Sequence, residues 1–419
     1  MRQSKLFTKT RKEAPADEIS KNAQLLIRGG FINKEMAGVY SYLPLGLKVF
    51  KKIENIIREE MNAIGGQEIV LSSLQEKETW EPTDQWNDEN IDVWFKTKLK
   101  NETELGLAVT HEAAITKMLK NFLQSYRDLP QYVYQFQTKF RNEIRAKSGI
   151  MRCREFVMKD LYSFDIDEKA HLEFYEKSKK AYKTIFERVG IGHLTYLTFA
   201  SGGMFSPFSH EFQTLTSAGE DTIYVDESKG IAINKEVNND EVLAKLGVKK
   251  EDLVEHRAVE VGNIFTLGTR FSDALDLKYQ TEEGEKKSVF MGSYGIGPGR
   301  VMGTVVEVLS DDKGIIWPEA IAPFRVHLLS LGEDEAIIAE ANKVYETLVK
   351  NKVEVLFDDR IGMSAGEKFA DADLLGMPLR AVVSQRSIKE LGIELKKRTE
   401  EKGQVVSLDE LLKMLETKA

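Results

Sequence analysis

The sequence contains little or nothing of several features that mark particular classes of protein. It has a single cysteine, Cys153, which excludes a disulfide scaffold and a cysteine-built zinc site and favours a reducing compartment. No run of about 18 apolar residues occurs, so no membrane span is expected. The first 19 residues lack the apolar core of a secretory signal. Repeats and low-complexity tracts are also missing. We therefore expect a folded cytoplasmic protein.

An excess of positive charge is missing as well. The chain has 59 Lys+Arg against 67 Asp+Glu, a net charge of −8, with 42% apolar and 30% charged residues. This balance excludes a largely disordered chain and a wholly basic nucleic-acid binder. It leaves nucleic-acid binding open, because binding depends on where the positive charge lies. With 419 residues, the chain should hold two or three domains.

The first third of the chain shows a clear helix-to-strand pattern. Residues 16–28 have a helical pattern that stops at Gly29-Gly30. Pro44 then opens a long amphipathic helix that ends at Gly65-Gly66. The next segment, QEIVLSSL (67–74), is predicted to be a strand.

The central part alternates predicted strands with two helices. The sequences 131–140 and 155–164 alternate apolar and polar residues, which predicts an antiparallel hairpin with a basic loop. Helices are expected at 168–189 and 298–309, and further strands in SHEFQTLT, GEDTIYV, AVEVGNIFTLG and KKSVFMGSYG.

Two polar segments suggest how the chain is divided. Residues 226–258 are charge-dense and poor in large apolar side chains, so we interpret them as a surface connector with a helix near 239–246. Residues 317–323 form a plausible linker, after which the order β-α-β-α-β predicts a small α/β domain with a parallel or mixed sheet. The overall prediction is an α/β protein with domains at 1–320 and 324–419.

The predicted central hairpin concentrates positive charge. From Lys139 to Lys159 the chain carries seven basic and two acidic residues, a local charge of +5. Arg141 and Glu143 share one strand face, because side chains two positions apart point the same way. Arginines beside a carboxylate suit a phosphate ligand that carries a polar base. A solvated, charged hairpin is the alternative.

The segment from Gly295 to Arg300, GIGPGR, is a second candidate ligand site. It lacks the last glycine of a dinucleotide fingerprint and the Gly-Lys-Ser/Thr of a phosphate-binding loop. A helix opened by Pro298 with Arg300 in its first turn would still present N–H groups and a cation to an anion. A tight packing turn is the alternative. No G-x-S-x-G elbow and no zinc-type His/Cys spacing is found.

Taken together, these segments resemble the class II aminoacyl-tRNA synthetases, and most closely the prolyl-tRNA synthetases of the bacterial type. The resemblance covers nearly the whole chain. The Pro44 helix with QEIVLSSL resembles the first class motif, which builds the dimer interface in that family. The other matching segments are FRNE (140–143) with MRCREF (151–156), MGSYGIGPGR (291–300), THE (110–112), SHEFQ (209–213), EVGNIFTLGTRFSDAL (260–275) and the anticodon-domain segment 358–378.

The resemblance implies an α+β catalytic domain with a mostly antiparallel sheet and an anticodon-binding domain at 324–419. It also implies ATP-dependent ligation of L-proline to tRNA(Pro) through prolyl-adenylate, with Mg²⁺ as cofactor and ligands that the sequence does not identify. Arg141 and Arg300 are expected to stabilise phosphate charge in the reaction. The implied ATP-binding residues are Arg141, Glu143, Arg152, Phe156, Ser293 and Arg300, and the implied proline-binding residues are Thr110, Glu112, Arg141 and His210.

Two further expectations concern partners. A homodimer is expected through the Pro44 helix region. Contact with the tRNA anticodon must use local patches, because residues 323–419 contain 15 Lys+Arg and 18 Asp+Glu. Candidate contacts, from their place in the matching segment, are Arg360, Lys368, Asp373 and Arg380; an ordinary charged surface is the alternative for each.

The chain departs from the bacterial-type family in two places. Bacterial-type relatives commonly carry an editing domain between the second and third motifs, where this chain has only 226–258. A proline pocket rejects alanine weakly, because missing methylenes are worth about 1–3 kcal/mol. We therefore expect some alanyl-tRNA(Pro) and a separate deacylase. Phe205, Pro207 and Phe208 replace small residues before His210 and could narrow the pocket.

Two alternatives to proline ligation remain. The first is a class II synthetase for another amino acid such as threonine, although the sequence lacks a His/Cys zinc cluster. The second is a synthetase-like tRNA-binding or regulatory protein that does not charge tRNA. Such proteins usually lose motif arginines, whereas Arg141 and Arg300 are present here.

Overall fold

The computed structural model describes residues 1–144, 146, 148–201 and 208–416, except for the side chain of Phe208. Arg145, Lys147, Phe205 and Pro207 therefore lie outside the described residues, together with the expectations that involve them. Within the described ranges, no helix is long and apolar enough to cross a membrane. The chain forms two compact units, one of residues 35–40 and 53–304, the other of 1–34, 41–52 and 305–419.

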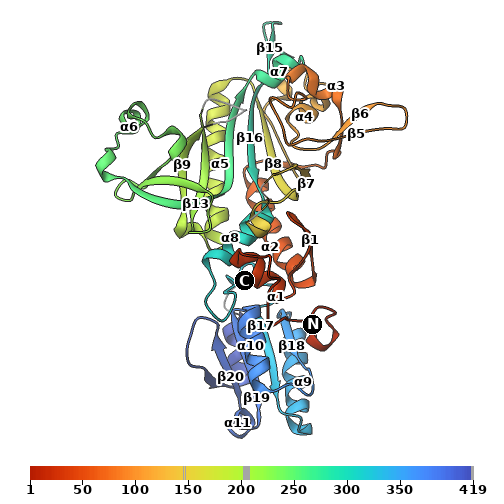
Figure 1. Cartoon of the computed structure of the whole chain (residues 1–419), viewed down its shortest axis with the longest axis vertical. Helices are drawn as coiled ribbons and strands as arrows, with labels where there is room; N and C mark the ends of the chain where they lie inside the picture. The colour runs from red at the N-terminus through yellow and green to blue at the C-terminus, as the bar shows by residue number, and fades with distance from the viewer. Residues whose placement is uncertain (145, 147, 202–207, 417–419) are drawn as a thin grey trace. The chain divides into compact units, whose positions relative to one another are not determined.

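The first unit is built on a nine-stranded, mostly antiparallel sheet (Figure 1). Strand β10 pairs with both β9 and β13, so strands β9 to β13 close into a ring of paired strands. In spatial order the strands are β10 (Phe208–Leu215), β9 (Thr195–Ser201), β12 (Ile231–Asn234), β11 (Asp221–Asp226), β13 (Val254–Gly268), β16 (Phe290–Ile296), β8 (Glu155–Asp165), β7 (Gln131–Phe140) and β3 (Gln67–Glu68).

The predicted central hairpin is confirmed. Strands β7 and β8 pair antiparallel from Gln131 opposite Phe164 to Phe140 opposite Glu155. Strand β16 continues the sheet on the other side of β8, with Ser293 opposite Tyr162. This order brings the basic hairpin next to the glycine-rich segment, although the two are far apart in the sequence.

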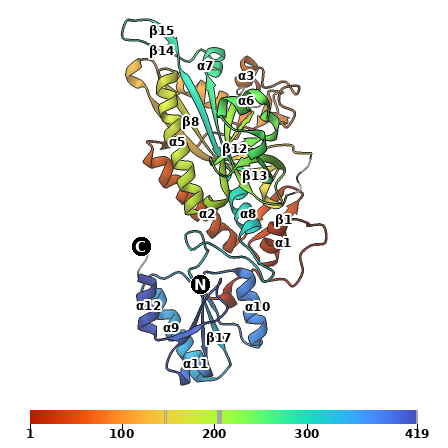
Figure 2. The ribbon, with the colours of Figure 1, turned by 90° about the vertical axis from the view of Figure 1, so that its left-hand side faces the viewer.

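One long helix covers part of this sheet. Helix α5 (Glu168–Arg188) is capped at its N-terminus by Asp167, whose carboxylate accepts from the N–H of Ala170 at 2.8 Å. Its buried face includes Phe174 and Tyr182 and packs on β8, β13 and β16 (Figure 2). The opposite face of the helix is rich in lysine and glutamate, as expected for an amphipathic surface helix.

A smaller group of elements packs beside β7 and β8. It contains a three-stranded sheet, three short helices and a two-stranded hairpin. Trp80, Trp86 and Trp94 form its aromatic core, with Trp80 and Trp94 ring centroids 5.4 Å apart. The elements are β4 (Leu74–Glu76), α3 (Lys77–Trp80), β5 (Phe95–Lys98), β6 (Glu104–Leu107), α4 (Glu112–Leu119), α7 (Arg270–Ala274), β14 (Lys278–Gln280) and β15 (Lys286–Ser288).

The predicted strand 67–74 is wrong over most of its length. Gln67 and Glu68 form β3, which pairs with β7, and Leu74 begins the separate strand β4, so residues 69–73 lie outside any strand. Within this stretch, the N–H of Leu71 donates to the side-chain carbonyl of Gln135 at 2.9 Å, and the Gln137 amide donates to the carbonyl of Leu71. The backbone ladder ends with the bond from the N–H of Ile69 to the carbonyl of Tyr134 at 2.8 Å, and side chains of β7 replace it at Leu71, an exchange that apolar patterning does not reveal.

Residues 226–258 contain more ordered structure than the surface connector that we predicted. The expected helix is present as α6 (Asp240–Leu246), capped by Asn239. Strand β12 in the same segment belongs to the nine-stranded sheet, with Ile233 fully buried. Ile233 packs with Val242 and Leu243 of α6 in a small core.

The second unit contains the predicted β-α-β-α-β order. Its five-stranded sheet is mixed, because β17 pairs parallel with β18 and β19, whereas β20 and β21 run antiparallel. Helices α9 and α12 lie on one face and α10 on the other (Figure 2). The elements are β17 (Val326–Leu331), α9 (Glu335–Lys350), β18 (Val355–Asp358), α10 (Ala365–Leu375), β19 (Leu379–Ser384), α11 (Gln385–Lys389), β20 (Ile393–Lys397), β21 (Gln404–Val406) and α12 (Leu408–Glu416).

The N-terminal residues fold with this second unit. The amino group of Met1 donates to the carbonyl of Val355 at 2.7 Å. In α1 (Lys21–Arg28), Asn22 donates to Glu307 from its backbone and its side chain. Four further elements have residues in both units: β1 (Ile32–Met36), β2 (Val39–Tyr42), α2 (Pro44–Ala63), which confirms the Pro44 helix, and α8 (Pro298–Val308).

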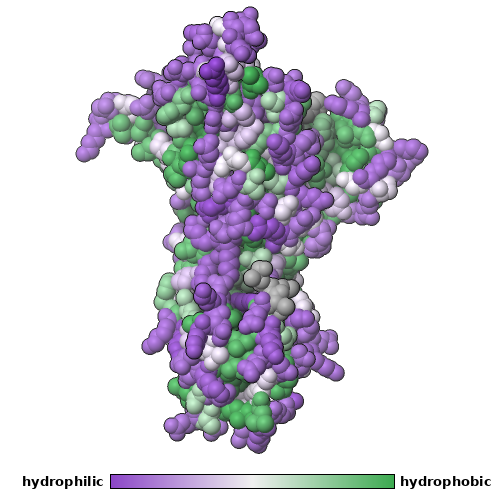
Figure 3. All heavy atoms as spheres, turned by 180° about the vertical axis from the view of Figure 1, so that it is seen from behind, coloured by the Kyte–Doolittle hydropathy of each residue, from purple (hydrophilic) through white to green (hydrophobic). Residues whose placement is uncertain are grey.

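The observed architecture confirms the predicted fold class, with one mostly antiparallel α+β unit and one smaller α/β unit. Hydrophilic side chains cover most of the face drawn in Figure 3, and apolar side chains form smaller groups among them. That surface agrees with a chain in which 30% of the residues are charged.

Candidate active site

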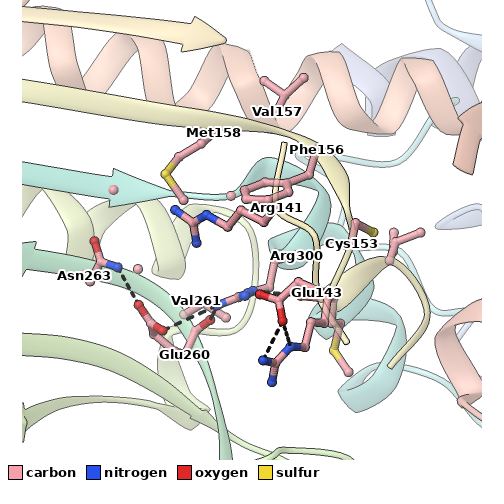
Figure 4. A pocket seen from close by; sticks show the side chains of 16 residues that line it. Arg141, Glu143, Cys153, Phe156, Val157, Met158, Glu260, Val261, Asn263 and Arg300 are labelled. Atoms are coloured by element: carbon pink, nitrogen blue, oxygen red, sulfur yellow. Dashed lines mark hydrogen bonds and ion pairs between the residues drawn. The ribbon is translucent and has the colours of Figure 1, made fainter. Parts of the chain in front are cut away.

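A cavity lies where the ends of three strands meet the first turn of α8 (Figure 4). Arg141 follows directly on β7, and Phe156 lies near the start of β8. Glu260 comes from β13, and Arg300 from the first turn of α8. The sheet order β13-β16-β8-β7 therefore gathers these four side chains from distant parts of the sequence.

Five of the six residues that we expected to bind ATP line this cavity. They are Arg141, Glu143, Arg152, Phe156 and Arg300. The sixth, Ser293, lies on β16 and donates from its hydroxyl to Glu112 at 3.2 Å. The structure thus places Ser293 with residues that were assigned to the amino acid.

Arg141 presents its guanidinium to the cavity. Its Nε donates to the carbonyl of Val109 at 3.4 Å, and the guanidinium carbon lies 5.3 Å from the centroid of the Phe156 ring (Figure 4). Burial and the nearby Arg300 cation lower the pKa of Arg141. Two cations held close together around a cavity favour an anionic ligand with several oxygens.

Arg300 is held by backbone carbonyls and one carboxylate. Its Nε donates to the carbonyl of Met151 at 2.8 Å and an Nη donates to the carbonyl of Glu260 at 3.0 Å. The Glu260 carboxylate lies 3.5 Å from the same guanidinium and accepts from Asn263 at 2.6 Å. Arg300 is therefore fixed in orientation at the N-terminus of α8, where helix N–H groups also favour an anion.

Glu143 and Arg152 are paired with each other in the structure. Arg152 donates to one Glu143 oxygen from Nε at 3.0 Å and from Nη at 2.8 Å. Arg152 also pairs with Glu220, which in turn accepts from the hydroxyl of Ser148 at 3.1 Å. A ligand base that donates an amino group to Glu143 would share or displace the Arg152 contact.

Thr110, Glu112 and Ser293 form a second, buried group of side chains. The Thr110 hydroxyl donates to Glu112, which also accepts from Ser293. Glu112 is 2% exposed, and burial raises its pKa. Because Val109 touches Arg141, this acidic group adjoins the cationic cavity.

His210 lies on β10, whose neighbour β13 is separated from β8 and β7 by β16. Its register partner on β13 is Ile264. Its Nδ1 bonds the hydroxyl of Tyr175 at 2.9 Å, and its ring makes an edge contact with Phe199. Burial lowers the pKa of His210 to about 4, so the ring is neutral at neutral pH. Among the described residues, no hydrogen bond joins His210 to Thr110, Glu112 or Arg141.

The four anticodon-contact candidates are already engaged within the second unit. Arg360 pairs with Asp358 at 2.6 Å and with Asp371 at 2.8 Å. Lys368 is 3% exposed and donates to the carbonyl of Ser330 at 2.9 Å. The other two candidates, Arg380 and Asp373, pair with each other at 3.1 Å, and the Arg380 guanidinium lies over the ring of Phe369.

Sequence reasoning missed a buried polar network behind Glu112. Lys139, counted above as part of a basic hairpin, is fully buried and pairs with Asp160 at 2.7 Å. His111 bonds the same ammonium at 2.7 Å. The alternating pattern gave no signal for this burial, because Lys139 shares its strand face with the polar residues Gln135 and Gln137. In the described ranges, no group of three or more His, Cys, Asp or Glu side chains could hold a metal ion by itself.

Comparison with protein families gives two matches that together span most of the chain. Residues 95–309 match the tRNA synthetase class II core domain (G, H, P, S and T). Residues 324–418 match the anticodon binding domain. The first match includes every residue assigned above to ATP and proline, and the second includes the four anticodon-contact candidates.

Curated relatives and solved structures agree with these matches. A proline–tRNA ligase of Wolbachia sp. subsp. Drosophila simulans (strain wRi) is 35% identical over 432 aligned positions, covering 100% of both chains. That of Ehrlichia ruminantium (strain Gardel) is 36% identical, covering 98% of this chain and 99% of the relative. Full coverage of both chains leaves no room for a large domain inserted in only one of them.

The fold is shared with a solved structure described as Giardia lamblia prolyl-tRNA synthetase in complex with prolyl-adenylate. It superposes with a TM-score of 0.77 at 19% identity, covering 93% of this chain and 74% of that one. From the core and anticodon-domain matches and the full-length relatives, we conclude that this chain belongs to the proline–tRNA ligases and has no inserted editing domain.

Proposed function

We propose that this protein ligates L-proline to tRNA(Pro) in two steps, with Arg141, Arg300 and Glu112 as the central residues. One observation carries the proposal: Arg141 lines the cationic cavity and also touches Val109, which adjoins the Thr110–Glu112 group. A single guanidinium therefore lies between a site for phosphate and a site for an ammonium group.

In the first step, a proline carboxylate oxygen attacks the α-phosphorus of ATP. A new P–O bond forms, the bond to the bridging oxygen breaks, and pyrophosphate leaves. Arg141 neutralises charge at the α-phosphate and the carboxylate, and Arg300 neutralises the departing pyrophosphate. Glu112 accepts from the secondary ammonium of proline and so fixes its orientation.

In the second step, the terminal ribose hydroxyl of tRNA(Pro) attacks the activated carbonyl. The ester bond forms, AMP leaves, and the hydroxyl proton passes to solvent or to the phosphate. His210, neutral and bonded to Tyr175, is assigned to the wall of the proline pocket rather than to proton transfer. Glu143 and Phe156 are assigned to the adenine, by acceptance from its amino group and by stacking.

For Mg²⁺, the residues present offer suitable donors. Glu260 faces the cavity, and Glu211 of β10 has a pKa raised to about 8 by burial and by the charge of Glu260. Carboxylate oxygens that repel one another fit a hard cation, and Mg²⁺ usually binds one or two carboxylates together with substrate phosphates. When bound, the ion would supply charge neutralisation at the phosphates.

We further propose a cytoplasmic homodimer, paired through the α2 region, with residues 1–320 as the catalytic domain and 324–419 as the anticodon-binding domain. Arg360, Lys368, Asp373 and Arg380 are proposed at or near the anticodon site. Because Lys368 is buried, its contribution there would be to hold Ser330 and Asp358 in place rather than to touch a base.

The test is aminoacylation of a tRNA(Pro) transcript with labelled proline, ATP and Mg²⁺, with tRNA(Thr) and threonine as the matched control. Charging with proline supports the proposal. Charging with threonine only would favour a synthetase for another amino acid. If neither amino acid formed an adenylate, the protein would be a tRNA-binding or regulatory protein that does not charge tRNA.

Without an editing domain, we also propose that the enzyme releases some alanyl-tRNA(Pro) and depends on a separate deacylase. Incubation of preformed alanyl-tRNA(Pro) with the purified protein should leave its deacylation rate at the spontaneous value. Rapid deacylation by the protein alone would overturn this part of the proposal.

A further inference from the structure

A buried ionic cluster lies directly behind the Thr110–Glu112 group and takes no part in the steps above. Lys139 of β7 donates to Asp160 of β8 at 2.7 Å, and its ammonium also bonds Nδ1 of His111 at 2.7 Å. Lys139 and His111 are fully buried and Asp160 is 3% exposed. Burying three ionisable side chains in this way costs free energy unless each is paired and hydrogen-bonded.

The pairing fixes the proton positions on His111. An ammonium group has only donors, so Nδ1 of His111 must accept from Lys139. The proton of the neutral ring is then on Nε2, which donates to the carbonyl of Ser72 at 3.1 Å. Burial and the neighbouring Lys139 charge lower the pKa of His111 to about 4, which keeps this tautomer neutral. His111 is thus clamped at both nitrogens.

His111 lies between Thr110 and Glu112, at the point where the loop after β6 enters the first turn of α4; residues 110–112 are called the Thr110–Glu112 loop below. The two hydrogen bonds to the His111 ring therefore fix the backbone that carries the side chains of Thr110 and Glu112. Another hydrogen bond holds the same loop: the Gln75 amide donates to the carbonyl of Thr110 at 3.0 Å. The order of contacts runs from Asp160 through Lys139 and His111 to the loop.

Asp160 is itself held by several donors. Its Oδ2 accepts from Gln135 at 2.9 Å and from the hydroxyl of Tyr162 at 2.9 Å, while Oδ1 accepts from Lys139. Burial raises the pKa of the Glu112 carboxyl, and the Lys139 ammonium opposes part of that rise. The charged groups near Glu112 are therefore Lys139 and Asp160 of the cluster and Arg141 at the cavity.

We propose that Lys139, anchored by Asp160 and acting through His111, is a positioning residue that sets the Thr110–Glu112 loop for the ammonium group of the amino acid substrate. The inference rests on the proposed function, since it takes Glu112 to be the acceptor for proline. It assigns to a buried lysine a role in amino acid affinity that is separate from ATP binding.

The test is proline-dependent ATP–pyrophosphate exchange, measured as KM for proline and KM for ATP. In Lys139→Met the KM for proline should rise about 10- to 100-fold, because a displaced loop misplaces its acceptor, while the KM for ATP stays within about threefold. Lys159→Met is the matched control. Lys159 is also a fully buried lysine, on β8, but it bonds Tyr182 and the carbonyl of Tyr294, so both KM values should stay within about threefold.

Variants of His111 test the same clamp with the Lys139–Asp160 pair intact. In His111→Gln the amide can accept from Lys139 and donate to Ser72, so the KM for proline should remain close to that of the wild type. His111→Phe has a similar volume but neither contact, so it should show the rise expected for Lys139→Met. This comparison decides the inference if Lys139→Met does not fold.

The outcomes separate the inference from the proposed function. A selective rise in the KM for proline, with rescue by His111→Gln, supports the inference. Unchanged values in His111→Phe, or equal rises for proline and ATP, would overturn it and leave a purely structural cluster. Absence of proline-dependent exchange in the wild type would instead refute the proposed function.

Discussion

Replacing Arg141 by alanine is expected to remove most of the activity while leaving the fold intact. Among the described residues, the guanidinium makes one hydrogen bond, the 3.4 Å contact of its Nε with Val109. Its remaining N–H groups are directed to the cavity (Figure 4). The substitution therefore costs the fold one hydrogen bond, whereas the reacting groups lose the charged N–H donors of the guanidinium.

The magnitude follows from the number of lost contacts. A hydrogen bond to a charged group contributes about 1.5–3 kcal/mol, and Arg141 can make one to the α-phosphate and one to the proline carboxylate. Loss of both costs about 3–6 kcal/mol, and since 1.4 kcal/mol is tenfold, kcat/KM should fall by about 10²- to 10⁴-fold.

Pyrophosphate exchange at subsaturating proline measures this change directly. Arg127→Ala is the control of equal charge, because Arg127 is exposed and its side chain contacts only the neighbouring Tyr126 among the described residues. The control should retain the wild-type rate, and both variants should melt near the wild-type temperature. A loss below about tenfold in a folded Arg141→Ala would refute the placement of this residue between the two substrates.

Two further predictions concern stability. Gly46→Ala would place its Cβ against the carbonyl oxygen of Phe31, at a cost of about 1–3 kcal/mol and a lower melting temperature, whereas Gly366→Ala in α10 meets no atom and should stabilise by about 0.5–1 kcal/mol; equal effects of the two would contradict the packing at Gly46. The hydrogen bonds from Arg398 hold the pKa of Asp311 well below its usual range. Asp311→Asn should therefore lower the melting temperature at pH 7, and the difference from the wild type should shrink as the pH falls below about 4.

Local patterns predicted the parts of the fold in which backbone pairing follows side-chain alternation. Strands β7 and β8 alternate along their length, so their hairpin could be read directly from the sequence. The helix opened by Pro44 and the alternating elements after residue 324 were equally clear. Segment 67–74 failed, because side chains of Gln135 and Gln137 occupy its backbone groups.

Long-range packing lay beyond such patterns. Nothing in the first residues indicates that the amino group of Met1 reaches Val355, or that Asn22 reaches Glu307. These contacts join segments separated by hundreds of residues, and they place the N-terminus in the same unit as the small α/β sheet.

The structure brings together residues that the sequence named from distant segments. Arg141, Glu143, Arg152 and Arg300 were named for their charge and spacing, Phe156 was named from the family resemblance, and all five line one cavity. The pairing of Lys139 with Asp160 was not predicted, because a lysine in a strand gives no sign of whether it faces water or the core. The same ambiguity applied to Lys368, which is buried rather than exposed to a ligand.

Amino-acid-dependent ATP–pyrophosphate exchange across the twenty amino acids reports the specificity of the active site without tRNA. We expect strong exchange with proline, weak exchange with alanine and none with threonine. Exchange with threonine and none with proline would contradict the assignment of Thr110, Glu112 and Arg141 to a proline site.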